Sequence, residues 1–175
     1  MKYNFKLLII TPTYLPAYHI GGPVFQINQM SNYLDIKKVN YKILSTKNSF
    51  SRGGKKAKNT IYLNSYLGNL YFSFELILFL FKEIKKYDKV YIVSCFNFFS
   101  LFSALICSFF KRDYFLSPRG SLMKKSVDFK NKLIKKIWIF LFEKRSNCIS
   151  SRTINCDLEN LKSKLLIKLF FNLSL

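Results

Sequence analysis

Short apolar runs that alternate with helical segments constrain the fold of this chain more than any other feature. The first run is Lys6–Ile10, whose sequence KLLII is apolar at every position after the lysine. A strand without polar alternation is buried on both faces, which is typical of a parallel sheet covered by helices. The predicted strands are Lys6–Ile10, Tyr41–Ser45, Thr60–Leu63, Lys89–Val93, Tyr114–Leu116 and a weak strand at Cys148–Ser150.

Helical segments separate most of these runs. They are predicted at Phe25–Leu34, Leu70–Lys86, Phe98–Phe110, Asn131–Arg145 and Asp157–Lys168, and Ser49–Asn59 reads as an exposed basic loop. Strands alternating with helices predict an α/β fold, a Rossmann-like parallel sheet with helices on both faces. Ligands of such sheets bind beyond the carboxyl ends of the strands, so the loops after the first, fourth and fifth strands are the candidate site.

The charge of the chain is strongly positive. Lys and Arg number 29 against 9 Asp and Glu, a formal net charge of +20, and only five of the basic residues are Arg. Such a field attracts polyanions. Arg is the usual base-reading residue and no common nucleic-acid motif is present, so specific nucleic-acid binding is not expected. Diffuse Lys charge favours an anionic membrane surface or a phosphate-bearing substrate.

The four cysteines show neither a CxxC pair nor metal-ligand spacing. Cys95, Cys107, Cys148 and Cys156 are therefore expected to be buried free thiols, and no metal site is predicted. The segment from Met1 to Ile10 has only a short apolar run and no cleavage site, so it is not a signal peptide. We expect a cytoplasmic chain, peripheral at the inner face of the cell membrane if it contacts lipid.

One stretch has an alternative interpretation. Val90–Phe110 is 21 residues without a charge, long enough for a transmembrane helix. It contains several serines, however, and divides into a β-branched piece and a helix-like piece, as a buried strand followed by a packed helix would. The buried interpretation is favoured, and a small membrane protein that spans at 90–110 remains the alternative.

The loop after the first strand carries a glycine pair, Gly21-Gly22, followed by Pro23, which suits the first turn of a helix. Glycines let backbone N–H groups approach a ligand, and the N-terminus of a helix favours an anion. The pair matches neither a dinucleotide fingerprint nor a P-loop, and a plain turn is an equal alternative. His19, the only histidine, is a candidate cleft contact, although a surface loop position is favoured.

A second candidate turn follows the fifth strand. Its sequence LSPRGSL places Ser117, Arg119, Gly120 and Ser121 at the ligand edge, and Arg119 has donors suited to sugar hydroxyls or phosphate oxygens. A structural turn with a solvated arginine is the alternative. Asn97, in the loop after the fourth strand, is a further candidate for the same cleft.

Together these segments resemble the N-terminal domain of GT4-type glycosyltransferases with the GT-B fold. The resemblance runs from about Lys6 to about Leu161, through IITPTYLPAYHIGGP, YDKVYIVSCFNFFSLFSA, YFLSPRGSL, KIWIFLFEKR and ISSRTINCDLENL. It implies one half of a GT-B fold, with residues 1–165 as the acceptor-side domain and 166–175 as a truncated tail. The C-terminal donor domain, which carries the family's E-x7-E signature, is expected to be missing.

The resemblance also implies site roles. The Gly21-Gly22 loop would face the interdomain cleft near the donor diphosphate, and the SPRG turn would line the same cleft, with Arg119 where many relatives have a histidine. No residue is assigned as catalytic, and no cofactor or metal is expected. Tyr91-Ile92-Val93 stands where relatives often have H-I-H, and Lys124-Lys125-Ser126 replaces an aromatic-containing segment.

The function implied by the resemblance is transfer of a sugar from a nucleotide sugar to a glycan or lipid-linked acceptor, with retention of configuration. The chain alone is expected to be inactive, and an inactive remnant or one half of a split enzyme with a separate C-terminal half is the alternative. The basic amphipathic helix around Trp138 could contact anionic lipid, although a helix packed on the sheet with solvated lysines is the commoner case.

Overall fold

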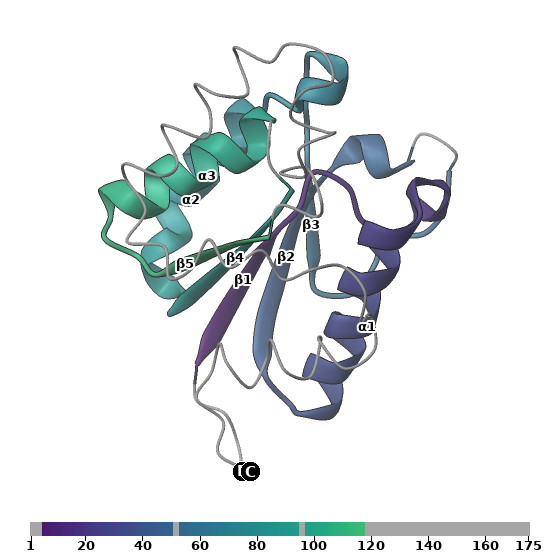
Figure 1. The fold of residues 1–175 in the computed structure, drawn as a ribbon, viewed down its shortest axis with the longest axis horizontal. Coiled ribbons are helices and arrows are strands. Elements are labelled where there is room, and N and C mark those ends of the chain that lie inside the picture. The colour runs from purple at the N-terminus through teal and green to yellow at the C-terminus, as the bar shows by residue number, and fades with distance from the viewer. Residues whose placement is uncertain (1–4, 51–52, 95–96, 118–175) are drawn as a thin grey trace, which may run out of the picture.

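A computed structural model describes residues 5–50, 53–94 and 97–117 of the 175-residue chain. Within these ranges the chain forms a five-stranded sheet in the order β3-β2-β1-β4-β5 (Figure 1). The strands are β1 (Lys6–Ile10), β2 (Asn40–Thr46), β3 (Thr60–Leu63), β4 (Lys89–Val93) and β5 (Tyr114–Ser117). Every neighbouring pair is parallel, so the predicted α/β Rossmann-like fold is confirmed.

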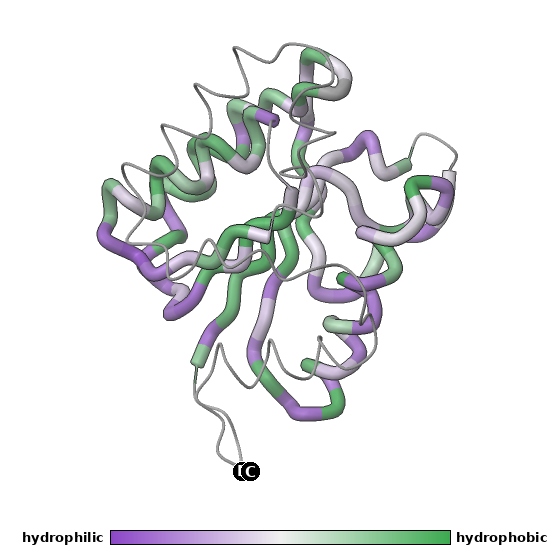
Figure 2. Tube along the Cα trace, in the orientation of Figure 1, coloured by the Kyte–Doolittle hydropathy of each residue, from purple (hydrophilic) through white to green (hydrophobic). Residues whose placement is uncertain are grey.

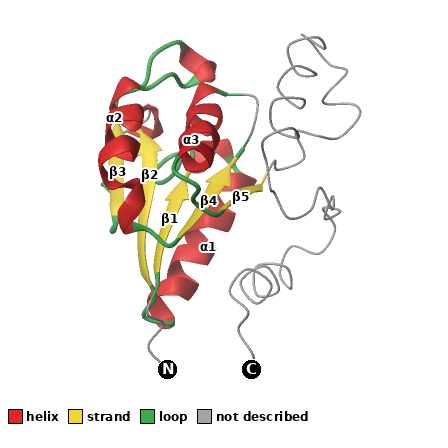
Figure 3. Cartoon of the chain, turned by 90° about the vertical axis from the view of Figure 1, so that its left-hand side faces the viewer, coloured by secondary structure: helices red, strands yellow, loops and turns green. Residues whose placement is uncertain are grey.

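Helices cover both faces of the sheet. They are α1 (Gly22–Ile36), α2 (Phe74–Glu83) and α3 (Phe98–Phe109), with α1 on one face and α2 and α3 on the other (Figure 3). Leu7 and Ile9 of β1 pack with residues of α1, whereas Leu8 and Ile10 pack with residues of α2 and α3. The unbroken apolar run of β1 is therefore explained by helices on both sides of the strand.

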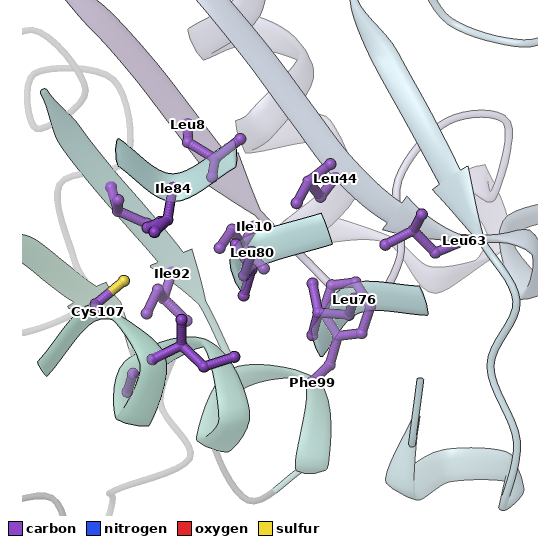
Figure 4. Packing of buried hydrophobic residues seen from close by; sticks show 13 residues of the cluster. Leu8, Ile10, Leu44, Leu63, Leu76, Leu80, Ile84, Ile92, Phe99 and Cys107 are labelled. Carbon is purple, nitrogen blue, oxygen red and sulfur yellow. The ribbon is translucent and has the colours of Figure 1, made fainter. Parts of the chain in front are cut away.

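The larger of the two cores lies between the sheet and the α2–α3 pair (Figure 4). Leu76 and Leu80 of α2 and Ile84 directly after it pack in one cluster with Leu8 and Ile10 of β1. Cys107 of α3 is buried in the same cluster as a free thiol, and burial raises the pKa of this thiol to about 12. The prediction of a buried free cysteine is confirmed at this position, and the other three cysteines lie outside the described residues.

The second predicted helix, Leu70–Lys86, is wrong at its start. The chain forms a short 3-10 helix at Gly68–Leu70, Tyr71 then adopts a left-handed conformation with φ 50°, and α2 begins only at Phe74. Ser73 sets this start, because its buried hydroxyl accepts a hydrogen bond of 3.2 Å from the backbone N–H of Leu76. A serine at this capping position satisfies one of the free N–H groups of the first turn. At the other end, Ile84–Lys86 continues as a 3-10 helix.

The uncharged stretch Val90–Phe110 is divided between two elements. Its first residues belong to β4 in the sheet, and its later ones form the 12-residue helix α3. Within the described ranges, no helix combines the length and the apolar character needed to cross a bilayer. The alternative of a protein spanning at 90–110 is therefore wrong. Two buried serines of α3 are accommodated because their hydroxyls donate to nearby backbone carbonyls, Ser100 to Asn97 at 3.1 Å and Ser103 to Phe99 at 2.7 Å.

The predicted exposed loop Ser49–Asn59 is only partly confirmed. Ser49 lies within a short 3-10 helix, Lys47–Phe50, and its side chain is buried and hydrogen-bonded. The residues from Gly53 onward are largely exposed. The predicted elements Asn131–Arg145, Cys148–Ser150 and Asp157–Lys168 lie outside the described residues.

The α2–sheet core predicts a contrast between two leucines of one helix. Leu80 is fully buried, whereas Leu78 is 47% exposed. We expect Leu80→Ala to lower the free energy of unfolding by about 2–5 kcal/mol, because it removes buried methyl groups and leaves a cavity. Leu78→Ala is the matched control, with an expected change below about 0.5 kcal/mol. Urea unfolding of the full chain measures both, and equal losses would contradict the described packing.

Candidate functional site

The carboxyl ends of β1 and β4 lie side by side at the point where the strand order reverses. β1 pairs with β2 on one side and with β4 on the other, so the connections from these two strands leave in opposite directions along the sheet. Crevices at such a switch point are the usual ligand sites of open parallel sheets. The end of β5 adjoins this edge, since the N–H of Ser94 donates to the carbonyl of Ser117 at 2.8 Å.

The loop that leaves β1 is held in place by buried hydroxyl groups at the end of β2. Thr46 donates its hydroxyl proton to the carbonyl of Pro12 at 2.7 Å. Ser49 accepts a hydrogen bond of 3.0 Å from the N–H of Tyr14 and bonds to the hydroxyl of Ser45 at 3.2 Å. All three hydroxyl residues are at most 1% exposed. None of the three was a candidate from the sequence, although three small hydroxyl residues close to the end of a predicted strand were the available signal.

Two tyrosines add hydrogen bonds that hold the same loop, Tyr14 from within the loop and Tyr62 from β3. The hydroxyls of Tyr14 and Ser31 lie 2.9 Å apart, and because Ser31 donates to the carbonyl of Asn28, Tyr14 is the donor. Tyr62 donates to the carbonyl of Leu15 at 2.7 Å. Burial raises the pKa of Tyr14 to about 12 and also raises the pKa of Tyr62. Both phenols therefore stay protonated near neutral pH and act as structural donors.

A close backbone approach completes this anchoring. Gly54, in the segment between β2 and β3, has φ +118°, and a Cβ added there would lie 2.5 Å from the ring carbons of Pro16. Only glycine fits between this segment and the β1 loop. The segment from Thr11 to Ala17 is therefore fixed by hydrogen bonds and by packing, which is the rigid support that a binding loop needs.

The glycine pair stands where α1 begins. Gly21 has φ 80° and ψ −137°, a conformation open essentially to glycine, and Pro23 occupies the first turn as predicted. No side chain caps this helix end, and its first turn has no acidic residue. A Cβ added at Gly21 or Gly22 would have no atom within 4 Å. The N–H groups of Gly21 and Val24 donate to the carbonyls of Tyr18 and Gly21 at 3.0 and 3.1 Å, and Pro23 has no N–H. Gly22 therefore provides the backbone N–H of this turn that can meet a ligand, and the dipole of the 15-residue helix favours an anion there.

Exposed aromatic rings lie beside this open helix end. Tyr18 and Phe25 are 53% and 49% exposed, and their ring centroids are 5.7 Å apart. His19 lies between them in sequence, on the 3-10 helix Tyr18–Ile20, and it is exposed. This position agrees with the favoured surface location of His19.

Of the other candidate residues, Asn97 and Ser117 are described. Asn97 is buried and caps α3, since its side-chain oxygen accepts from the N–H of Ser100 at 2.8 Å and its amide donates to Ser94 at 3.2 Å. Ser117 is half-buried at the end of β5, on the edge that also holds the β1 loop. Arg119, Gly120 and Ser121 lie outside the described residues, so the geometry of the SPRG turn remains a prediction.

One carboxylate pair has the E-x7-E spacing, Glu75 and Glu83 of α2. Eight positions along a helix separate these residues by about 12 Å. Glu75 accepts a hydrogen bond of 2.8 Å from the N–H of Asn64, which lowers the pKa of Glu75, and Glu83 pairs with Lys86 at 2.8 Å. The two carboxylates therefore make separate contacts at opposite ends of α2. In the described part of the chain, no group of His, Cys, Asp and Glu could hold a metal ion.

Comparisons with known proteins add little to this geometry. No protein-family model and no curated protein matches the chain. Among solved structures, the chain is similar to the UDP-GlcNAc 2-epimerase from Methanocaldococcus jannaschii, with 20% identity and a TM-score of 0.47. The similarity covers 76% of this chain and 36% of the epimerase chain. The strand order and the helix layers themselves define a Rossmann-like α/β domain.

The glycine pair predicts different responses to one substitution. We expect Gly21→Ala to lower the free energy of unfolding by about 1–3 kcal/mol, because a Cβ strains the backbone at φ 80°. Gly22→Ala should leave it unchanged or raise it by up to about 1 kcal/mol, since Gly22 is helical and a Cβ there meets open space. Thermal unfolding of both variants checks this, and equal destabilisation would contradict the described turn.

Proposed function

We propose that this chain is the acceptor-side domain of a GT-B glycosyltransferase. The intact enzyme would transfer a sugar from a nucleotide sugar to a glycan or lipid-linked acceptor, with retention of configuration. The proposal rests on the GT4-like sequence segments from about Lys6 to about Leu161 and on one structural observation. That observation is the N-terminus of α1 at Gly21-Gly22, which no side chain caps and to which the loop after β1 leads.

The open helix end would serve the leaving diphosphate of the donor. Negative charge develops on this group as the glycosidic bond to the nucleotide breaks, and fixed N–H dipoles aimed at it lower the barrier. The buried support of the β1 loop by Thr46, Ser49 and Tyr62 would keep the helix end in position without reorganisation. No metal is part of this proposal, because the helix N-terminus and basic side chains supply the positive potential.

The acceptor would lie near the aromatic pair. Tyr18 and Phe25 offer exposed ring faces beside the glycine turn, and ring faces suit the C–H side of a sugar. Arg119, on the SPRG turn, would contribute donors to hydroxyl or phosphate oxygens. Ser117 would place that turn at the same edge of the sheet.

Nucleoside diphosphate binding tests the proposal. UDP, GDP and ADP are titrated separately into the full chain by calorimetry, at physiological salt to suppress general attraction to the +20 charge. We expect one of them to bind and Gly22→Asp to weaken its affinity about tenfold, because one added negative charge beside the diphosphate costs on the order of 1.4 kcal/mol. The melting temperature should not fall, since an acidic residue in the first turn stabilises a helix.

Gln29→Asp is the matched control. Gln29 is exposed in α1, two turns beyond Gly22, and its substitution changes the net charge by the same amount. We expect less than a twofold effect on affinity. If none of the three nucleotides binds, or if both aspartate variants bind equally well, the glycine turn is not a diphosphate site.

A further inference from the structure

Exposed apolar side chains are concentrated in one part of the molecule. Eleven large hydrophobic residues are exposed in the described part of the chain, and seven of them come from α2, from the turn before it and from the end of α3. These seven are Tyr66, Leu67, Leu70, Phe74, Leu78, Phe81 and Phe109. Single exposed apolar residues are normal on protein surfaces, whereas a contiguous group indicates an interaction site.

The outward side of α2 carries the centre of this group. Phe74, Leu78 and Phe81 stand at positions i, i+4 and i+7, which share one side of a helix, and are 59%, 47% and 49% exposed. Phe109 of α3 is 73% exposed, and its ring centroid lies 6.3 Å from that of Phe81. We call these four residues the α2–α3 apolar face. It points away from the sheet, because the opposite side of α2 packs into the core.

Basic side chains border this face where the two helices end. Lys82, Lys85, Lys111 and Arg112 lie in α2, in the 3-10 turn after it and after α3. Arg112 donates to the carbonyl of Lys85 at 3.0 Å, which joins the two helix ends, and the ammonium of Lys85 lies 5.3 Å from the Phe110 ring centroid. Figure 2 shows the chain change from hydrophobic along α3 to hydrophilic at the turn before β5.

The nearby carboxylates are engaged elsewhere. Glu83 pairs with Lys86 at 2.8 Å, Asp113 pairs with Lys89 at 2.8 Å, and Glu75 accepts hydrogen bonds from Asn64. Within the described ranges, none of the four bordering basic residues forms a salt bridge. Their charge is therefore available to an outside partner.

We propose that the α2–α3 apolar face docks on an anionic lipid bilayer. A helix whose exposed side combines Phe and Leu with Lys suits the headgroup boundary, where rings enter the acyl region and ammonium groups reach lipid phosphates. A second copy of the chain fits less well, because each copy would bring its +20 charge to the contact. The proposal rests on α2 and α3 alone and does not depend on the proposed function or on the predicted helix at Asn131–Arg145.

Vesicle binding of the full chain tests this docking. Co-sedimentation is measured with two kinds of vesicle. One is phosphatidylcholine with about 30% phosphatidylglycerol, which gives a negative surface potential like that of a cytoplasmic leaflet, and the other is phosphatidylcholine alone. We expect much stronger binding to the anionic vesicles. The triple variant Phe74→Ser, Leu78→Ser, Phe81→Ser should lose at least about tenfold in partition coefficient, since it removes the inserting side chains without touching the core.

Two matched controls separate this face from general effects. Ile36→Ser removes a side chain that is 76% exposed at the far end of α1, away from the proposed acceptor site, and it should change binding less than twofold. Lys82→Gln, Lys85→Gln, Lys111→Gln should lower anionic-vesicle binding at least about tenfold. A second triple variant removes the same charge from the exposed segment before β3 and should lower anionic-vesicle binding less; it is Lys55→Gln, Lys56→Gln, Lys58→Gln.

Several outcomes would overturn the proposal. The first is equal binding to both vesicle types, and the second is an equal loss of binding in the face and control variants. The third is a wild-type oligomer that the face variant converts to a monomer, because the face would then be a contact between copies of the chain. Light scattering on the same samples detects the last outcome. Nucleoside diphosphate titration of the face variant is run in parallel, so failure of lipid docking is distinguished from failure of the glycine-turn site.

Discussion

The pairing of β1 with two parallel neighbours is the interaction on which the rest of the structure depends. Leu7 to Ile10 are fully buried, with hydrogen bonds to β2 on one side and to β4 on the other. Because both faces of this strand are apolar, helices must cover both, and α1 and the α2–α3 pair do so. Parallel strands also place every carboxyl end at one edge. The ligand edge is thus a consequence of the same pairing that builds the core.

The strands were predictable because their sequence signal is local. Lys6–Ile10, Thr60–Leu63 and Lys89–Val93 were predicted with their observed bounds, and β2 and β5 extend by one residue beyond prediction at one or both ends. Helix starts were harder, since the apolar run from Leu70 continues smoothly into α2. The start depends on the Ser73 cap and on the left-handed Tyr71, which hydrophobic periodicity does not register.

The candidate site was predictable only in its position. Gly21 and Pro23 could be placed at the opening of a helix from residue type alone, because glycine suits the backbone at φ 80° and proline suits the first helical turn. The hydroxyl support of the β1 loop could not, since Thr46 and Ser49 reach Pro12 and Tyr14 across more than thirty positions of sequence. Asn97 has a structural role that its position in a loop did not reveal, because its side-chain oxygen caps α3, and its proposed place in the cleft stays a prediction.

The two proposed surfaces lie on different sides of the sheet, and this separation follows from the fold. The glycine turn opens α1, which packs on the face lined by Leu7 and Ile9, whereas the apolar side of α2 points outward from the opposite face. A bilayer against α2 and α3 would therefore leave the open end of α1 accessible to a soluble anion. In addition, α2 approaches the ligand edge only with its N-terminal end, where Ser73 and Glu75 already engage the nearby backbone N–H groups of Leu76 and Asn64. Lipid docking and diphosphate binding can therefore occur together, because neither uses a residue that the other requires.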